Sequence, residues 1–176
     1  MARSKEGSDK PERPTQPAKK APSESRSAAK VLPTDAEFVS DMSPKSGKQE
    51  GYLAGQLLVA MPNMRDPRFE RTVIYMCVHN AEGAMGLVIN KSVGSLTFPQ
   101  LLRQLGIPKE GAIDRRVHFG GPVEMGRGFV LHTDEYEQES TVKVKPGYAV
   151  TATIDILKAI AEGGGPRQAL LALGYA

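Results

Sequence analysis

The sequence contains one cysteine, no tryptophan and no apolar run of the roughly 18 residues that a membrane-spanning helix requires. A single cysteine cannot form an internal disulfide, so the cysteine content gives no indication of an oxidising compartment. The first residues also lack the continuous apolar core of a secretory signal. These absences predict a soluble, cytoplasmic protein that does not act in a membrane.

A basic patch on the folded part of the chain is equally missing from the linear sequence. Residues 1–30 carry eight basic and four acidic side chains, whereas residues 51–176 carry thirteen and twelve. Nucleic-acid-binding domains usually show their positive charge on the domain itself. Nucleic acid is therefore only weakly supported as a partner, through a basic N-terminal arm or through arginines that the fold gathers on one face. Those arginines are Arg65, Arg68, Arg71, Arg115 and Arg116.

Composition divides the chain into two parts. Residues 1–50 contain six prolines and only scattered apolar side chains. Such a segment cannot bury enough apolar surface to offset the entropy lost on ordering, so we predict a disordered basic tail with at most a turn of helix at 35–41. Residues 51–176 are predicted to form one folded domain.

The folded part begins with a dense apolar run, Gly51–Met61, followed by a Pro-Asn turn signal. Its length and its bracketing by glycine and proline predict a strand that is buried on both faces. In the polar segment 65–71, Pro67 suits the first turn of a short helix that Asp66 would cap.

A β-hairpin is predicted where two β-rich runs, 73–78 and 85–89, flank the polar connector 80–83. Because strand side chains alternate between faces, Cys77 and His79 are expected to share one face, about 6–7 Å apart. That separation is too long for a direct hydrogen bond. Cys77 is therefore interpreted as an inert buried thiol, with a nucleophile or redox sensor as the alternative.

The remaining segments predict a mixture of short helices and strands. Helices are expected from Thr97 to Gly106 and from Thr153 or Asp155 to Ile160, with a loop at 108–113 between them. Strands are expected at 115–119, 128–132, 141–145 (a half-exposed or edge strand), 148–154 and 169–173. Because strands and helices mix without regular βαβ alternation, the predicted class is α+β.

An ordered set of motifs runs through the folded part of the chain. It comprises Leu57–Pro62, Asp66-Pro67, Val73–Asn80, Gly83–Lys91, Phe119–Pro122, Arg127–His132 and Leu173–Ala176. With these motifs, residues 53–176 resemble the AlgH/YqgE family of bacterial proteins. The resemblance implies a mixed fold in which a strongly curved sheet, tending towards a small barrel, is surrounded by short helices. It also implies that the C-terminal end of this chain is incomplete, because family members typically continue beyond the Gly-Tyr-Ala.

The residues that we select as ligand-binding candidates are polar groups and glycines near strand ends. His79 and Asn80 stand where the first hairpin strand meets its turn, and Asn90 ends the second strand. The alternative for His79 and Asn80 is a structural role in the turn, and the alternative for Asn90 is that it simply ends the strand. Arg65-Asp66 completes the site if the fold brings it close to them. The amides of Gly120-Gly121 could bind an anion, with close backbone packing as the alternative.

No cofactor and no metal site is predicted. The four residues that could supply soft or borderline metal ligands match no recognised zinc spacing. They are Cys77, His79, His118 and His132.

Three functions follow from these observations. The first is a binding or regulatory protein without catalysis, acting through an unidentified protein or small-molecule partner; family members are often called transcriptional regulators. The second is a hydrolase-like enzyme that uses a His79, Asn80 and Asp66 site, with or without Cys77. It requires an open pocket that brings these groups within hydrogen-bond reach, and the resemblance supplies no catalytic residues. The third is nucleic-acid binding through the arginines.

Overall fold

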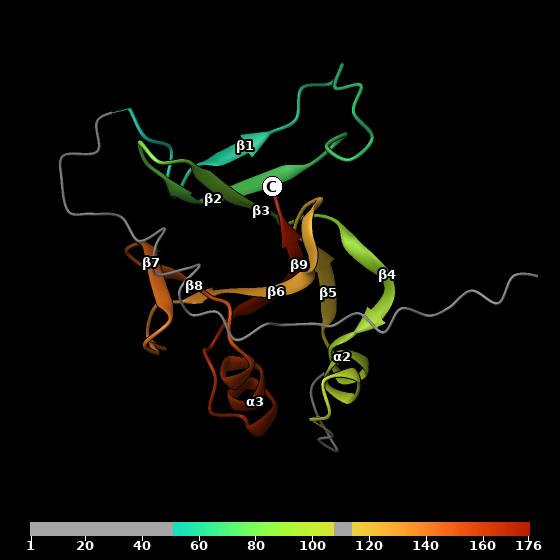
Figure 1. Ribbon diagram of the computed structural model, residues 1–176, viewed down its shortest axis with the longest axis vertical. Helices are drawn as coiled ribbons and strands as arrows, with labels where there is room; N and C mark the ends of the chain where they lie inside the picture. The colour runs from blue at the N-terminus through green and yellow to red at the C-terminus, as the bar shows by residue number, and fades with distance from the viewer. Residues whose placement is uncertain (1–50, 108–113) are drawn as a thin grey trace, which may run out of the picture.

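The computed structural model describes residues 51–107 and 114–176, so the predictions for 1–50 and for the loop 108–113 lie outside the described residues. The described residues form two sheets and two helices (Figure 1). The smaller sheet has the order β1-β2-β3, with β1 at Leu57–Val59, β2 at Val73–His79 and β3 at Ala84–Val88.

The larger sheet has six strands in the order β4-β5-β9-β6-β8-β7. Its strands are β4 (Ser92–Thr97), β5 (Arg116–Phe119), β6 (Val123–Thr133), β7 (Thr141–Lys145), β8 (Tyr148–Thr151) and β9 (Ala169–Tyr175). The helices are α2 (Phe98–Gln104) and α3 (Ile154–Glu162). The α+β class is confirmed, and the sheets do not close into a barrel.

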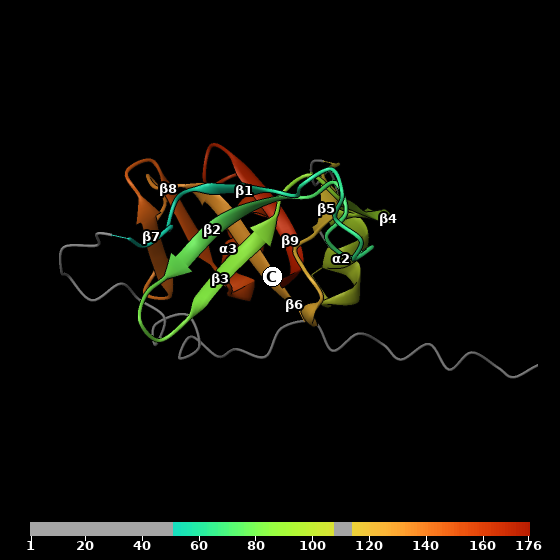
Figure 2. The ribbon, with the colours of Figure 1, turned by 90° about the horizontal axis from the view of Figure 1, so that it is seen from above.

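The molecule has three layers. Figure 1 shows the three-stranded sheet on one side of the six-stranded sheet and both helices on the other, and Figure 2 shows the small sheet lying over the large one. One buried cluster, which includes Leu87, Phe129 and Val150, fills the space between the sheets. A second, which includes Phe98 and Ile156, joins the large sheet to the helices. No helix in the described part of the chain is long and apolar enough to cross a membrane.

The helices begin and end where the sequence places their caps. Thr97 precedes α2 and forms a capping box with Gln100, and Thr153 precedes α3. Gly163 ends α3 in the left-handed conformation, with a φ of 82°. Strand β4, by contrast, is not predicted by the sequence, because its Ser-Val-Gly-Ser segment has a single β-branched residue, Val93, and a glycine, which is depleted in strands.

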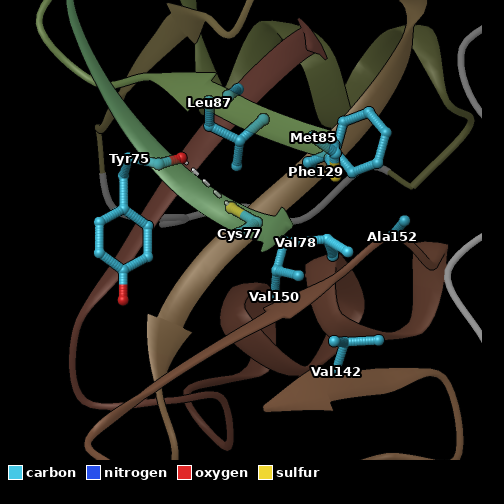
Figure 3. Close-up of a cluster of buried hydrophobic side chains, with 10 residues drawn as sticks. Tyr75, Cys77, Val78, Met85, Leu87, Phe129, Val142, Val150 and Ala152 are labelled. Carbon is cyan, nitrogen blue, oxygen red and sulfur yellow. Dashed lines mark hydrogen bonds between the residues drawn. The ribbon is translucent and has the colours of Figure 1, made fainter. Parts of the chain in front are cut away.

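The hairpin is confirmed, but its first strand does not alternate regularly. Met76 pairs with Gly86 and Val78 pairs with Met85, so Cys77 is the extra residue of a β-bulge. Cys77 and Val78 consequently both enter the cluster between the sheets (Figure 3). The predicted common face of Cys77 and His79 is wrong, because the bulge reverses the alternation between them.

Strand β1 is more exposed to solvent than the sequence predicts. It has only three residues, lies at the edge of the small sheet and is not buried on both faces. Leu57 is 56 % exposed and Val59 is 70 % exposed. The apolar composition of the run does predict a strand, but burial also needs a covering element, and no described element covers this one.

The two sheets are joined by backbone contacts at the end of β9. Ala176 and Gly86 exchange two N–H···O bonds of 2.9 Å, and the amide of Val88 donates to the carbonyl of Gly120 at 2.8 Å. A Cβ atom on Gly120 would stand only 2.1 Å from the carbonyl oxygen of Gly174. Glycine is therefore required at this position by the close approach of two backbones.

Replacing Gly120 with alanine is expected to lower the free energy of unfolding by at least about 2 kcal/mol, because backbone atoms cannot move away as a flexible side chain can. Urea unfolding followed by circular dichroism measures the change. The matched control is Gly83→Ala, where an added Cβ meets nothing within 4 Å and the change should stay within about 0.5 kcal/mol. Equal stability of the two variants would show that the contact is not needed.

Candidate functional site

The His79-Asn80 corner is held together by hydrogen bonds to the backbone. The Oδ1 atom of Asn80 accepts from the amides of Glu82 and Gly83 at 2.9 and 3.0 Å, which closes the hairpin turn. The Nδ1 atom of His79 accepts from the amide of Leu53 at 2.8 Å, and the ring of Tyr52 stands edge-on to the imidazole. Both side chains thus have structural roles that tie the turn and the preceding segment to β2.

Asn90 also forms structural hydrogen bonds to the backbone, at the opposite end of the hairpin. Its Oδ1 accepts from the amide of Val73 at 2.9 Å, and its Nδ2 donates to the carbonyl of Arg71 at 2.8 Å. The length of β2 separates this end from the His79-Asn80 corner by roughly 20 Å. The structure therefore does not bring Asn90 together with His79 and Asn80.

Asp66 organises the loop that precedes β2. Its Oδ1 accepts from the amide of Arg68 at 2.9 Å, and its Oδ2 is 2.6 Å from the guanidinium of that residue. The side-chain hydrogen bond from Arg68, followed by the backbone one, lowers the pKa of Asp66 to about 2. The carbonyl of Asp66 accepts from the amides of Phe69 and Glu70, which makes one turn rather than the predicted helix.

This loop lies beside the Asn90 end of the hairpin. The ammonium of Lys91 donates to the carbonyl of Arg68 at 3.2 Å. Arg65 is exposed and stands in the same loop. The structure thus places the loop that carries Arg65 and Asp66 beside the Asn90 end of the hairpin, and it leaves the His79-Asn80 corner apart from them.

Cys77 is 2 % exposed, and its thiol donates weakly to the carbonyl of Tyr75 (Figure 3). Burial raises the pKa of this thiol to about 12. Because of the bulge, the His79 side chain lies on the other face of β2, and Asp66 lies beyond the far end of the strand. The open pocket that a hydrolase built from these groups requires is therefore not formed.

Gly120 and Gly121 are buried against the end of β9. The amide of Gly120 donates to the carbonyl of Leu173 at 2.8 Å, so it is occupied by strand pairing. Gly120 and Gly121 therefore serve close backbone packing, and they do not form an open anion-binding site.

The histidines stand apart from one another. His132 is buried, with its ring nitrogens 2.9 Å from the carbonyl of Thr133 and 2.9 Å from the hydroxyl of Thr151. Burial lowers its pKa, and the bond to Thr133 opposes that shift. Within 51–107 and 114–176, no three His, Cys, Asp or Glu residues gather as a metal-binding group.

An apolar groove of about 450 Å³ on the outer face of the small sheet is not predicted by the sequence. Ile74 and Met76 form its floor, and Val59 and Met61 stand at its side. The last residue, Ala176, also lines it. The available sequence signal is the apolar run at 53–61, which predicts burial against something without saying what.

The five arginines do not form one basic face. Arg68 is paired with Asp66 in the loop before β2. That loop lies near the end of β5, because the backbone carbonyl of the neighbouring Lys91 accepts a hydrogen bond from the amide of Phe119. Arg115 and Arg116 stand at the other end, where β5 begins.

These features define a two-sheet α+β fold whose small sheet contains a β-bulged hairpin. A family model described as AlgH-like matches residues 57–176. The chain is 59 % identical over 130 residues to a UPF0301 protein of Rhodospirillum rubrum, covering 73 % of this chain and 68 % of that one. It is 53 % identical to one of Bradyrhizobium diazoefficiens, covering 76 % and 66 %. The chain belongs to the AlgH-like family.

Solved structures agree with this assignment. The solution structure of the AlgH protein from Pseudomonas aeruginosa is similar with a TM-score of 0.62 and 42 % identity, covering 75 % of this chain and 70 % of that one. A crystal structure of a Corynebacterium diphtheriae protein shares the fold at a TM-score of 0.53 and 15 % identity, covering 79 % and 70 %. The match spans 62 % of a further relative, from a Bradyrhizobium strain, so about a third of these relatives lies outside it.

The raised pKa of Cys77 makes stability depend on pH. The pKa rises from an ordinary 9.0 to about 12 on folding, so between these values the unfolded chain has lost a proton that the folded chain keeps. The stabilisation is complete below pH 9 and is lost as the pH rises. Relative to Cys77→Ala, the wild type should lose about 1.4 kcal/mol per pH unit there.

Urea unfolding of both proteins at pH 8, 9 and 10 measures this difference. The comparison with Cys77→Ala cancels the titration of groups that do not interact with Cys77, and pH 8 to 10 stays below the pKa of about 12 of the neighbouring Tyr75. A difference between the two proteins that stays constant from pH 8 to 10 would show that the folded thiol ionises normally.

Proposed function

We propose that this chain is a binding protein whose site is the groove on the outer face of β1-β2-β3, and that its partner is an apolar polypeptide segment carrying carboxylates. The observation that supports this most directly is the groove itself. Exposed apolar surface that gathers into one hollow, with a charged border, marks interaction sites more often than scattered apolar residues do.

The apolar contribution comes from side chains that water now surrounds. Val59 is 70 % exposed and Met61 is 66 % exposed. Covering such a side chain fully contributes about 1.5–3 kcal/mol. A segment that covers these two and reaches Ile74 would gain enough to offset part of its loss of freedom on binding.

The charged border selects the sign of the partner. The loop before β2 lines one end of the groove with Met64 and Phe69, and it carries an excess of positive charge. Its cationic side chains, with the adjacent lysine, are Arg65, Arg68, Arg71 and Lys91, and its acidic ones are Asp66 and Glu70. The side chain of Arg71 is 90 % exposed and lies 3.6 Å from the carboxylate of Glu70, a surface ion pair that contributes little to stability. This net positive border favours Asp and Glu on the partner.

The residues that the sequence suggests as ligand-binding candidates lie at the two ends of this groove in the proposal. Arg65, Asp66 and Asn90 belong to the basic end, where Asp66 and Asn90 position the loop and Arg65 contacts the partner. His79 and Asn80 belong to the turn at the opposite end. The regulatory role that the family resemblance implies would be exercised through contact with the partner.

Selection from a phage-displayed peptide library against the full chain tests the proposal. We expect enriched peptides to combine several apolar residues with Asp or Glu. The double variant Val59→Glu/Met61→Glu should weaken their binding at least about tenfold, because it places charge on the apolar wall. The matched control is Met125→Glu, an exposed apolar residue that does not line the groove, and it should bind as the wild type does.

Two outcomes would contradict the proposal. The first is an enriched peptide class whose binding is the same in the double variant and in the wild type. The second is self-association of the wild type, measured by light scattering, that the double variant abolishes. That result would identify a second copy of the chain as the occupant.

The two ends of the groove are distinguished by a second pair of variants. Arg65→Gln/Arg71→Gln removes charge from the basic end and should weaken peptide binding about three- to tenfold, with a shallower dependence on salt. His79→Ala/Asn80→Ala alters the turn end and should change affinity less than twofold. Isothermal titration at two salt concentrations measures both. A larger loss in the turn variant would move the site to the His79-Asn80 corner.

A further inference from the structure

A second hollow, of about 350 Å³, lies where β5 and β9 begin, and it shares no lining residue with the groove. Its apolar lining includes Phe98 from α2, Ile160 from α3 and Leu171 from β9. Its charged lining is Arg115 and Arg116, at the start of β5. Two layers of the fold, the large sheet and the helices, therefore meet at one small concave site that is mostly apolar with two cations in its lining.

Both arginines have donors available. Arg115 gives one guanidinium N–H to the carbonyl of Ala169 at 3.2 Å. Arg116 is exposed, and its side chain makes no hydrogen bond or ion pair with any described residue. Asp114, next to them in the chain, is in ion-pair contact with neither of them. Since each guanidinium carries several N–H donors, most of those in this pair are unused within the described residues.

A third polar group in the lining lacks a partner. The Nδ1 atom of His118 is buried and has no hydrogen bond within the described part of the chain. The backbone of His118 is fixed, because it pairs with Ser92 of β4 and with Ala172 of β9. Buried nitrogens without a partner are rare and costly in folded proteins, so the lining residue His118 has an unsatisfied ring nitrogen.

We propose that this hollow binds a small organic carboxylate with an aromatic or branched apolar body. A carboxylate matches the planar fork of a guanidinium and takes two parallel N–H···O bonds from it. The apolar body would pack against Phe98, Ile160 and Leu171. A cavity of about 350 Å³ lies at the lower end of the range for small-molecule sites, which suits a ring with a short side chain.

The ligand class is distinct from that of the outer-face groove. The groove of about 450 Å³ has no charged side chain in its lining, whereas the hollow of about 350 Å³ has two arginines in its lining. The groove belongs to the small sheet, whereas the lining of the hollow includes residues of both helices. Figure 1 shows the small sheet and the helices on opposite sides of the six-stranded sheet. Failure of the peptide-binding proposal would leave this one standing.

The test is an NMR titration of the isotope-labelled full chain with 3-phenylpropionate as the probe. We expect saturable shifts at the amides of 115–118 and 169–171, with a dissociation constant in the millimolar range or tighter. The neutral analogue 3-phenylpropanol should bind at least about tenfold more weakly, because it cannot accept charge-assisted bonds. Inorganic phosphate, an anion without an apolar body, should also bind more weakly.

Variants assign the effect to the arginines. Arg116→Gln alters a side chain without structural contacts, and Arg115→Gln/Arg116→Gln removes both cations; each should weaken binding, the double variant at least about tenfold. Arg103→Gln, on the exposed side of α2, is the matched control and should bind as the wild type does. Arg115→Lys keeps a donor for Ala169 and separates loss of binding from loss of fold.

Any of three results would overturn the proposal. One is the absence of shifts at 115–118 and 169–171 up to the solubility limit of the probe. Another is equal binding of 3-phenylpropanol or phosphate, which would remove the need for the carboxylate or for the apolar body. The last is unchanged affinity in a folded Arg115→Gln/Arg116→Gln variant.

Discussion

The backbone contact between Gly120 and the end of β9 holds the two sheets at a fixed distance. The carbonyl of Gly120 accepts from Val88 of the small sheet while its amide donates to Leu173 of the large one. No side chain fits between these backbones, so the spacing is set by strand-to-strand hydrogen bonds rather than by adaptable packing. Every feature that depends on the mutual position of the sheets depends on this contact.

One such feature is the core between the sheets, and the bulge in β2 completes it. An ordinary strand would send every second side chain away from that core. The extra residue at Cys77 lets two successive side chains, Cys77 and Val78, enter it. The same irregularity turns His79 to the other face, so a thiol and an imidazole two positions apart lose any chance of acting together. A single inserted residue thus places the thiol of Cys77 in the core and the imidazole of His79 on the opposite face of the strand.

The sequence predicts the features that local chemistry decides. The hairpin follows from two β-rich runs around a polar turn, and α3 follows from Thr153 and Gly163 at its ends. The role of Asn80 in the turn is of the same kind, because an Asn side chain bonds amides two and three residues away. These inferences need no knowledge of the rest of the chain.

Features assembled from distant segments could not be predicted in this way. The hollow at Arg115 needs α2, α3, β5 and β9 to meet, and no local pattern fixes that meeting. The bulge at Cys77 depends on pairing with β3, and the amino-acid composition of β2 does not indicate it. The exposure of β1 was missed for a related reason: an apolar run reports a tendency to be covered, whereas actual burial depends on another element being there.

The same reasoning explains why binding is better sought in the hollows than at the polar corners. Asn80, Asn90 and Asp66 already use their side-chain atoms to hold backbone groups, and a hydrogen bond of this kind contributes about 0.5–1.5 kcal/mol. A ligand at these corners would first have to match the bonds that it displaces. Val59 and Met61 face water, and the side chain of Arg116 lacks any described partner, so contacts to them replace only solvent. The residues that hold this fold together and the residues free to bind are therefore largely different sets.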